Sequence, residues 1–201
     1  MRKQFWALAF FCVAGANALS GQVSEVRAGS FEVGGFTGLS FGTLGTRVMG
    51  GGNVTYGFSK ILLGYAEYSY FPGIGETGST GTASGSGVQY TYHYTPRASD
   101  YNAGVHVRLP IFREKPIVPY LVAGIGGITH YAAVETFTVP GVAIGAGVIP
   151  EGTDVAFNGG GGVRWYMGQR FGVRVEAKVY KSTGLANTFG KVEVGFFYQT
   201  H

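Results

Sequence analysis

The residues that most often do chemistry in proteins are sparse in this sequence. Its histidines are His93, His106, His130 and His201, and none has a partner at the short, regular spacing that a zinc site requires. We therefore predict no metal site. The single cysteine, Cys12, lies in an apolar segment near the N-terminus, so the rest of the chain carries no thiol chemistry.

A glycine motif at residues 73–78 has the form Gly-x-Gly-x-x-Gly. In dinucleotide-binding proteins this motif is followed by a helix whose N-terminus meets the phosphate. Here the next residues are Ser, Thr and Gly without a helical period. We interpret residues 73–87 as a flexible loop and expect no cofactor.

The first residues have the three parts of a secretory signal peptide. Arg2 and Lys3 are positively charged, residues 5–14 are apolar but too few to cross a bilayer as a helix, and small residues surround Ala18. We predict a signal peptide over residues 1–18, cleaved after Ala18 or, as the alternative, after Ser20. The other alternative is an uncleaved anchor.

The composition excludes several classes of protein. Glycine makes up 36 of the 201 residues, well over twice the usual share of about 7%. An interior glycine costs a helix about 1 kcal/mol relative to alanine, so long helices are disfavoured. Apart from Arg2 and Lys3, the chain has 13 basic and 11 acidic residues, so its charge is nearly balanced. The basic residues form no run, and we therefore expect no nucleic-acid partner.

Alternation of apolar and polar residues, the pattern of a two-faced β-strand, organises the rest of the sequence. In residues 171–180, Val173 and Val175 lie on one face, and Arg174 and Glu176 on the other. Residues 119–131 are apolar on both faces, so we predict a strand there but do not assign which face points outward. The eight predicted strands are residues 30–41, 47–58, 61–71, 101–109, 119–131, 155–167, 171–180 and 191–199.

The predicted connections alternate in length after a short first loop. Turns at residues 58–60, 110–116 and 168–170 are short, whereas the connections at 73–99, 132–154 and 181–188 are longer. Short turns at one rim and long loops at the other are typical of an all-β, eight-stranded antiparallel transmembrane β-barrel. The alternative is a soluble barrel whose apolar face points inward.

Aromatic rings and charges decide which face points outward. Rings gather at the ends of the apolar faces, as expected for a lipid-facing band with two interfacial girdles. The opposite face has charges of both signs, and an eight-stranded barrel is just wide enough for side chains to fill. We expect these charges to form a structural network that plugs the lumen, in preference to lining a pore. Its predicted members are Glu32, Glu67, His106, Arg108, Arg164, Arg174, Glu176, Lys178, Lys191 and Glu193.

The runs at residues 119–127, 157–166 and 171–177 resemble the outer-membrane β-barrel domain family, which contains the OmpA-type and OmpW-type small barrels. The resemblance implies a periplasmic N-terminal lead over residues 19–29 and an outer-membrane barrel domain over residues 30–201. It also implies periplasmic termini, short periplasmic turns and long extracellular loops, in a bacterial outer membrane. The implied partners are outer-membrane lipid and the barrel assembly machinery, and no peptidoglycan-binding domain follows the last predicted strand.

Some small outer-membrane barrels are enzymes, and the lipid A deacylases among them use a His and a Ser two residues apart on a strand. In this chain the residues two positions after His93, His106 and His130 are Thr, Arg and Ala. We therefore expect no enzyme activity.

The favoured function is a non-enzymatic outer-membrane barrel with a structural or cell-surface interaction role. The alternative is a narrow OmpW-like channel for small or apolar molecules, and a lipid-modifying enzyme is the distant third. Two stretches, residues 88–95 and 137–144, are rich in aromatic or apolar residues for loops, so they either bind an extracellular ligand or pack on each other as a cap. The candidate contact residues are Tyr90, Tyr92, His93, Tyr94, Phe137, Val139 and Ile144.

Overall fold

The computed structural model describes residues 28–42, 46–72, 76–82, 89–94, 97–109, 116–131, 133–139, 142–149, 151–167, 170–183 and 188–200. The predicted signal peptide lies outside this part of the chain. Within it the structure has twelve β-strands. None of the described residues belongs to a helix long and apolar enough to cross a membrane.

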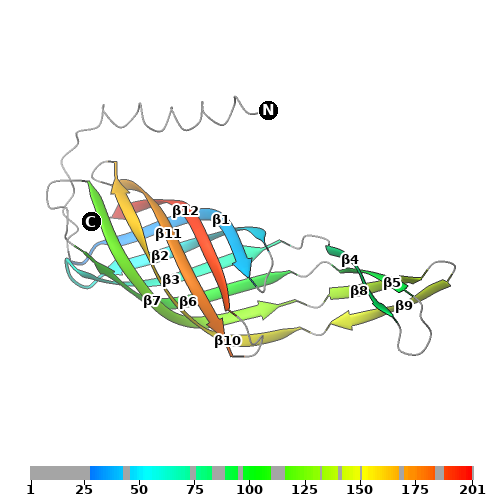
Figure 1. The fold of residues 1–201 in the computed structure, drawn as a ribbon. Helices are drawn as coiled ribbons and strands as arrows, with labels where there is room; N and C mark the ends of the chain where they lie inside the picture. The colour runs from blue at the N-terminus through cyan, green and yellow to red at the C-terminus, as the bar shows by residue number, and fades with distance from the viewer. Residues whose placement is uncertain are drawn as a thin grey trace, which may run out of the picture.

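Eight of the strands form a closed antiparallel barrel (Figure 1). They are β1 (Phe31–Gly42), β2 (Arg47–Gly57), β3 (Leu62–Phe71), β6 (Ala98–Arg108), β7 (Ile117–His130), β10 (Gly152–Tyr166), β11 (Phe171–Ser182) and β12 (Thr188–Thr200). The barrel closes where β1 pairs with β12, from Phe31 opposite Thr200 to Gly42 opposite Phe189. This confirms the predicted eight-stranded fold, and each predicted strand end lies within three residues of the observed one.

Four further strands form a second sheet beyond one rim of the barrel, in the order β4-β5-β8-β9 (Figure 1). They are β4 (Glu76–Thr82), β5 (Gln89–Tyr94), β8 (Ala133–Val139) and β9 (Val142–Ile149). The prediction of a flexible loop over residues 73–87 is therefore wrong for β4. Because β3 and β6 are neighbours in the barrel, the chain beyond their ends can continue the same antiparallel pairing, and Thr suits a strand.

Residues 88–95 and 137–144, which were predicted either to bind a ligand or to pack on each other as a cap, meet in this second sheet. Thr91, Tyr92 and His93 of β5 lie opposite Thr138, Phe137 and Thr136 of β8. The stretch at 137–144 is divided between β8 and β9, which form a hairpin. The long connections are thus two hairpins joined side by side, with β4 and β9 at the outer edges of the described sheet.

The two rims of the barrel differ in what they carry. We call the rim with the connections β2–β3, β6–β7 and β10–β11 the turn rim, and the opposite one the loop rim. The first strand, β1, starts at the turn rim and β12 ends there, because Phe31 pairs with Thr200. The second sheet stands beyond the loop rim (Figure 1).

The outer wall of the barrel is apolar and its inside is charged. Val175 is 48% exposed, whereas Arg174 and Glu176 on either side of it are 2% and 1% exposed. The same alternation runs along β1, β2, β3 and β12. This confirms the predicted faces and excludes the soluble barrel with an apolar interior. Such a wall needs an apolar solvent, and a closed barrel satisfies its backbone hydrogen bonds in lipid.

Aromatic rings mark both ends of the apolar belt. At the turn rim the rings of Tyr56 and Phe58 contact edge to face, with centroids 5.3 Å apart. The ring centroids of Phe171 and Tyr198 are 5.0 Å apart. Towards the loop rim Tyr68 and Tyr70 are exposed. Rings of this kind are favoured at membrane–water interfaces, so the belt between them is the expected hydrocarbon span.

We expect Val175→Arg to lower the free energy of unfolding by about 2–4 kcal/mol, the range for a basic residue near the middle of a bilayer. The reason is that the substitution places a guanidinium on the apolar belt. Equilibrium denaturation of the barrel folded into phospholipid vesicles measures the loss, and Val175→Leu is the control that keeps the face apolar. A Val175→Arg protein as stable as the parent would contradict the assignment of the faces.

Candidate functional site

A layer of apolar and aromatic side chains lies in the lumen near the loop rim, beside the buried polar residues Ser40, Arg47 and Ser182. Phe71 at the end of β3 and Ala98 at the start of β6 belong to it, which places it at the mouth of the barrel. Its buried members are Phe36, Met49, Phe71, Ala98, Ile128, Ala156, Tyr180 and Phe189. The main charged clusters therefore lie between this apolar layer and the turn rim.

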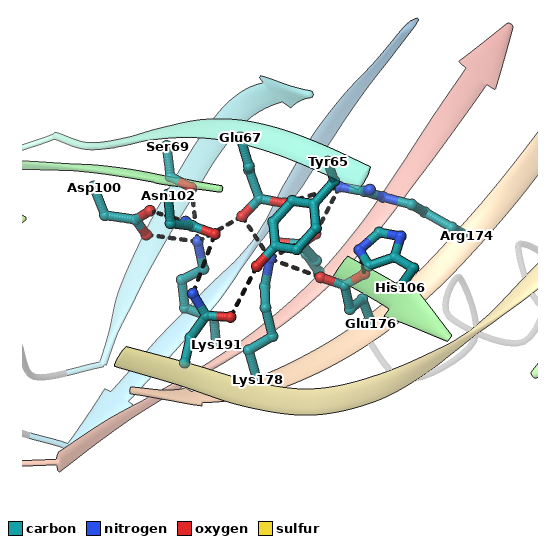
Figure 2. Close-up of polar contacts among 12 residues, drawn as sticks. Tyr65, Glu67, Ser69, Asp100, Asn102, His106, Arg174, Glu176, Lys178 and Lys191 are labelled. Atoms are coloured by element: carbon teal, nitrogen blue, oxygen red, sulfur yellow. Dashed lines mark hydrogen bonds and ion pairs between the residues drawn. The ribbon is translucent and has the colours of Figure 1, made fainter. Parts of the chain in front are cut away.

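Glu67 on β3 is the centre of the main charged cluster (Figure 2). Its Oε1 accepts hydrogen bonds from Lys178 Nζ at 2.6 Å and from Lys191 Nζ at 3.1 Å. Its Oε2 accepts one from Arg174 Nη2 at 3.2 Å. One carboxylate thus ties β3 to β11 and β12 across the inside of the barrel.

The same cations have further acidic partners. Lys178 Nζ lies 2.6 Å from Glu176 Oε1, Arg174 Nη2 lies 2.8 Å from Glu193 Oε1, and Lys191 Nζ lies 2.6 Å from Asp100 Oδ2. Tyr120 on β7 donates to Glu176, and Lys191 also donates to Ser69. These bonds, with those of Glu67, make the central cluster: Glu67, Asp100, Arg174, Glu176, Lys178, Lys191 and Glu193.

A second cluster, the turn-rim cluster, lies nearer the opposite mouth. Glu32 on β1 pairs through Oε1 with Arg108 Nη2 at 3.3 Å and through Oε2 with Arg164 Nη1. Arg108 also donates to the hydroxyl of Tyr166 at 3.1 Å, and Arg164 Nη2 lies 2.8 Å from His106 Nδ1. This cluster joins strands β1, β6 and β10.

Stacked rings separate the two clusters. The ring centroid of His106 is 4.5 Å from that of Tyr65 and 4.8 Å from that of Tyr120. The Arg164 guanidinium lies 5.1 Å from the centre of the Tyr120 ring and 5.5 Å from that of Phe197. Charges and rings thus both occupy the lumen at this level.

Inward-facing glycines make room for these rings. A Cβ added to Gly162 would lie 2.6 Å from Tyr120 Oη, and one added to Gly51 would lie 2.6 Å from Phe36 Cζ. Larger residues there would push the rings out of the lumen. Part of the glycine content therefore serves the packing of the interior.

All ten residues predicted for the lumen network lie in the lumen and are buried. Sequence reasoning missed Asp100, because β6 begins three residues before the predicted strand. It missed Tyr120 as well, because residues 119–131 are apolar on both faces and the pattern does not show which face points into the lumen. The predicted contact residues lie on β5, β8 and β9, where the structure describes backbone alone.

Three carboxylates of the central cluster resemble a cation site. Oxygens of Glu67, Glu176 and Glu193 lie within 4.8 Å of one another, and all three are buried. The ammonium of Lys178 takes the position of such a cation. Its Nζ lies 2.6 Å from Glu67 Oε1, 2.6 Å from Glu176 Oε1 and 3.8 Å from Glu193 Oε1. The trio is therefore the acidic half of an ion-pair network.

The ion pairs of the lumen are balanced as a whole. They join five cations, Arg108, Arg164, Arg174, Lys178 and Lys191, to five carboxylates, Glu32, Glu67, Asp100, Glu176 and Glu193. Buried charges are tolerated when they are paired and hydrogen-bonded. The arrangement can hold the strands together, and it leaves these side chains little freedom to act on a substrate.

Comparison with known proteins places the architecture. The attachment invasion locus protein Ail of Yersinia pestis matches with a TM-score of 0.54 and 12% sequence identity, over 87% of this chain and 100% of that chain. Its complex with the heparin analogue sucrose octasulfate matches with a TM-score of 0.51 and 11% identity, over 87% and 100%. The N-terminal β-barrel domain of Pseudomonas aeruginosa OprF matches with a TM-score of 0.49 and 14% sequence identity, over 87% of this chain and 98% of that chain.

No family model matches the sequence. No curated protein matches it either. The similarity to solved structures at this level of identity is a similarity of fold. The chain thus has the fold of the small eight-stranded outer-membrane β-barrels.

We expect Glu67→Met to lower the free energy of unfolding by about 3–5 kcal/mol, because removing one partner of a buried pair leaves the other uncompensated. Adding Lys178→Met removes one of the stranded cations, so the double variant should recover part of the loss. Equilibrium denaturation of the four proteins of this cycle gives the coupling energy. Glu151→Gln, at an exposed site, is the control for loss of one carboxylate. Purely additive losses would show that the pair is not coupled.

Proposed function

We propose that this protein is a non-enzymatic outer-membrane β-barrel protein of a Gram-negative bacterium, with a structural or cell-surface interaction role. The apolar belt with its aromatic ends supports a place in a lipid bilayer. A closed barrel of this kind leaves no sheet edge in the hydrocarbon. The charged N-terminal segment supports export from the cytoplasm.

The proposed orientation places the turn rim in the periplasm and the second sheet outside the cell. The start of β1 and the end of β12 lie at the turn rim, which fits periplasmic termini. Short periplasmic turns and longer extracellular connections are the usual arrangement of such barrels. The second sheet then stands above the outer leaflet.

The observation that carries the interaction role is the four-stranded sheet beyond the loop rim (Figure 1). It is held by the barrel through β3, β6, β7 and β10, and binding residues commonly collect on segments that a rigid scaffold positions. Among the described residues, its outer strands β4 and β9 have one neighbour each, and we propose that the other backbone edge is offered to a partner. The proposed contact residues lie on β5, β8 and β9 of this sheet.

The filled lumen supports this role more than transport. An apolar layer lies in the lumen near the loop rim, and ion pairs and stacked rings occupy the levels beneath it. A channel would need these side chains to move apart, which would expose charges that are now paired. The wall and lumen are thus proposed to act as a support, and the second sheet as the contact surface.

Single cysteines test the location and the orientation, since Cys12 is the one native cysteine. In a Cys12→Ser background, Ser79→Cys in β4 should react on intact cells with a maleimide that cannot cross membranes. Lys60→Cys in the β2–β3 turn should react after the outer membrane is made permeable, and not before. Equal labelling of both in the soluble periplasmic fraction would contradict the membrane location, and reversed labelling would contradict the orientation.

Replacing residues 74–95 by a short glycine-rich turn should leave the barrel folded. The reason is that β3 and β6 already pair from Leu62 opposite Val107 to Phe71 opposite Ala98. Folding is checked by the heat-dependent shift in gel mobility that intact barrels show. Capture of surface-biotinylated proteins and glycans from target cells should be lost, whereas a variant shortened at residues 111–114 of the turn rim should keep it. Equal capture by the trimmed barrel would refute the role of the sheet.

A further inference from the structure

The turn-rim cluster carries more positive than negative charge. Glu32 is the carboxylate in its ion pairs, and each of its oxygens already has a partner, Arg108 for Oε1 and Arg164 for Oε2. The other partners are the hydroxyl of Tyr166 and Nδ1 of His106, which accept hydrogen bonds and add no negative charge. Two guanidinium groups thus share one carboxylate.

Several buried polar atoms of this cluster have no hydrogen-bond partner among the described residues. They are Nε and Nη1 of Arg108, Nε of Arg164 and both amide atoms of Gln199. Arg108 is 4% exposed, and Arg164 and Gln199 are 1% exposed. Gln199 on β12 pairs in register with Glu32 on β1, which sets it at the level of the two arginines. Four of these five atoms are donors and one, Gln199 Oε1, is an acceptor. A buried charged donor without an acceptor is unfavourable, so the described part of the cluster is short of acceptors.

The central cluster does not supply that acceptor. It holds one more carboxylate than cations, Glu67, Asp100, Glu176 and Glu193 against Arg174, Lys178 and Lys191. The stacked rings of Tyr65, His106 and Tyr120 lie between the two clusters. His106 reaches across this level, with its Nε2 3.7 Å from Glu176 Oε2. Among the described residues, the ion pairs of Arg108 and Arg164 are with Glu32, so the excess positive charge of the turn-rim cluster has no further carboxylate partner in this part of the chain.

We propose that the turn-rim cluster binds one small inorganic anion of halide size, held by Arg108, Arg164 and Gln199. Guanidinium nitrogens are donors and never acceptors, and the Gln199 amide can turn its NH2 toward the same point. The positive excess rejects a cation, and the burial of all three side chains restricts the ion to a small one. Arg108 ends β6 and Tyr166 ends β10, which places the proposed site near the turn rim.

Crystals of the folded barrel soaked in sodium bromide provide the direct test. An anomalous bromide peak within hydrogen-bond distance of Arg108 and Gln199 supports the site, and density for water alone at that point overturns it. In solution, the unfolding temperature in detergent is followed while sodium gluconate is exchanged for sodium chloride at constant ionic strength. A saturable rise is expected, and an unchanged unfolding temperature would count against the proposal.

Matched variants separate this site from general salt effects. Gln199→Glu supplies a carboxylate in place of the ion, so it should raise the unfolding temperature in gluconate and abolish the response to chloride. Arg108→Gln should weaken the apparent chloride affinity at least about tenfold, since each lost charged hydrogen bond costs that order. Arg170→Gln, which removes an exposed arginine at the same rim, should keep the parent response. A Gln199→Glu protein with the parent chloride response would refute the site.

Discussion

Pairing of β1 with β12 is the constraint on which the rest of this structure depends. It joins strands at the two ends of the sequence, from Phe31 opposite Thr200 to Gly42 opposite Phe189. In an apolar solvent each unpaired peptide group costs several kcal/mol, so closure is required whatever the side chains are. Once the barrel is closed, each of its eight strands has one face toward the apolar surroundings and one in a narrow lumen. The alternation of Val175 with Arg174 and Glu176 follows from that geometry.

Closure also explains why the interior is ionic. Eight strands leave a lumen that side chains can just fill. Apolar side chains fill it at the loop rim, and Glu67 with Arg174, Lys178 and Lys191 fills it at the centre. These bonds run across the barrel between β3, β11 and β12, so they fix the position of strands that are not neighbours. The rigidity of the wall thus depends on the polar interior as well as on the backbone pairing.

The sequence predicted the barrel strands and their faces because both follow from a period of two in side-chain chemistry. Strand ends were less accurate, and Asp100 was missed because β6 starts earlier than the alternation indicates. The second sheet was missed for another reason. Residues 76–82 are Gly, Ser and Thr apart from Glu76, a composition that predicts flexibility, while their pairing depends on the barrel strands that bring the hairpins together. Partner choice within the lumen was also beyond the sequence, since Glu67 meets residues more than 100 positions away.

The two ends of the molecule are built for different environments. Near the loop rim the lumen contains an apolar layer, and the chain continues into hairpins whose strands β4 and β9 have one neighbour each within the described sheet. At the turn rim the lumen ends in Arg108, Arg164 and Glu32, where donors outnumber acceptors. Apolar side chains at the loop rim disfavour an ion, whereas the excess of donors in the described turn-rim cluster favours an anion. The anion site that we propose lies at the turn rim, and the contact surface that we propose stands beyond the loop rim.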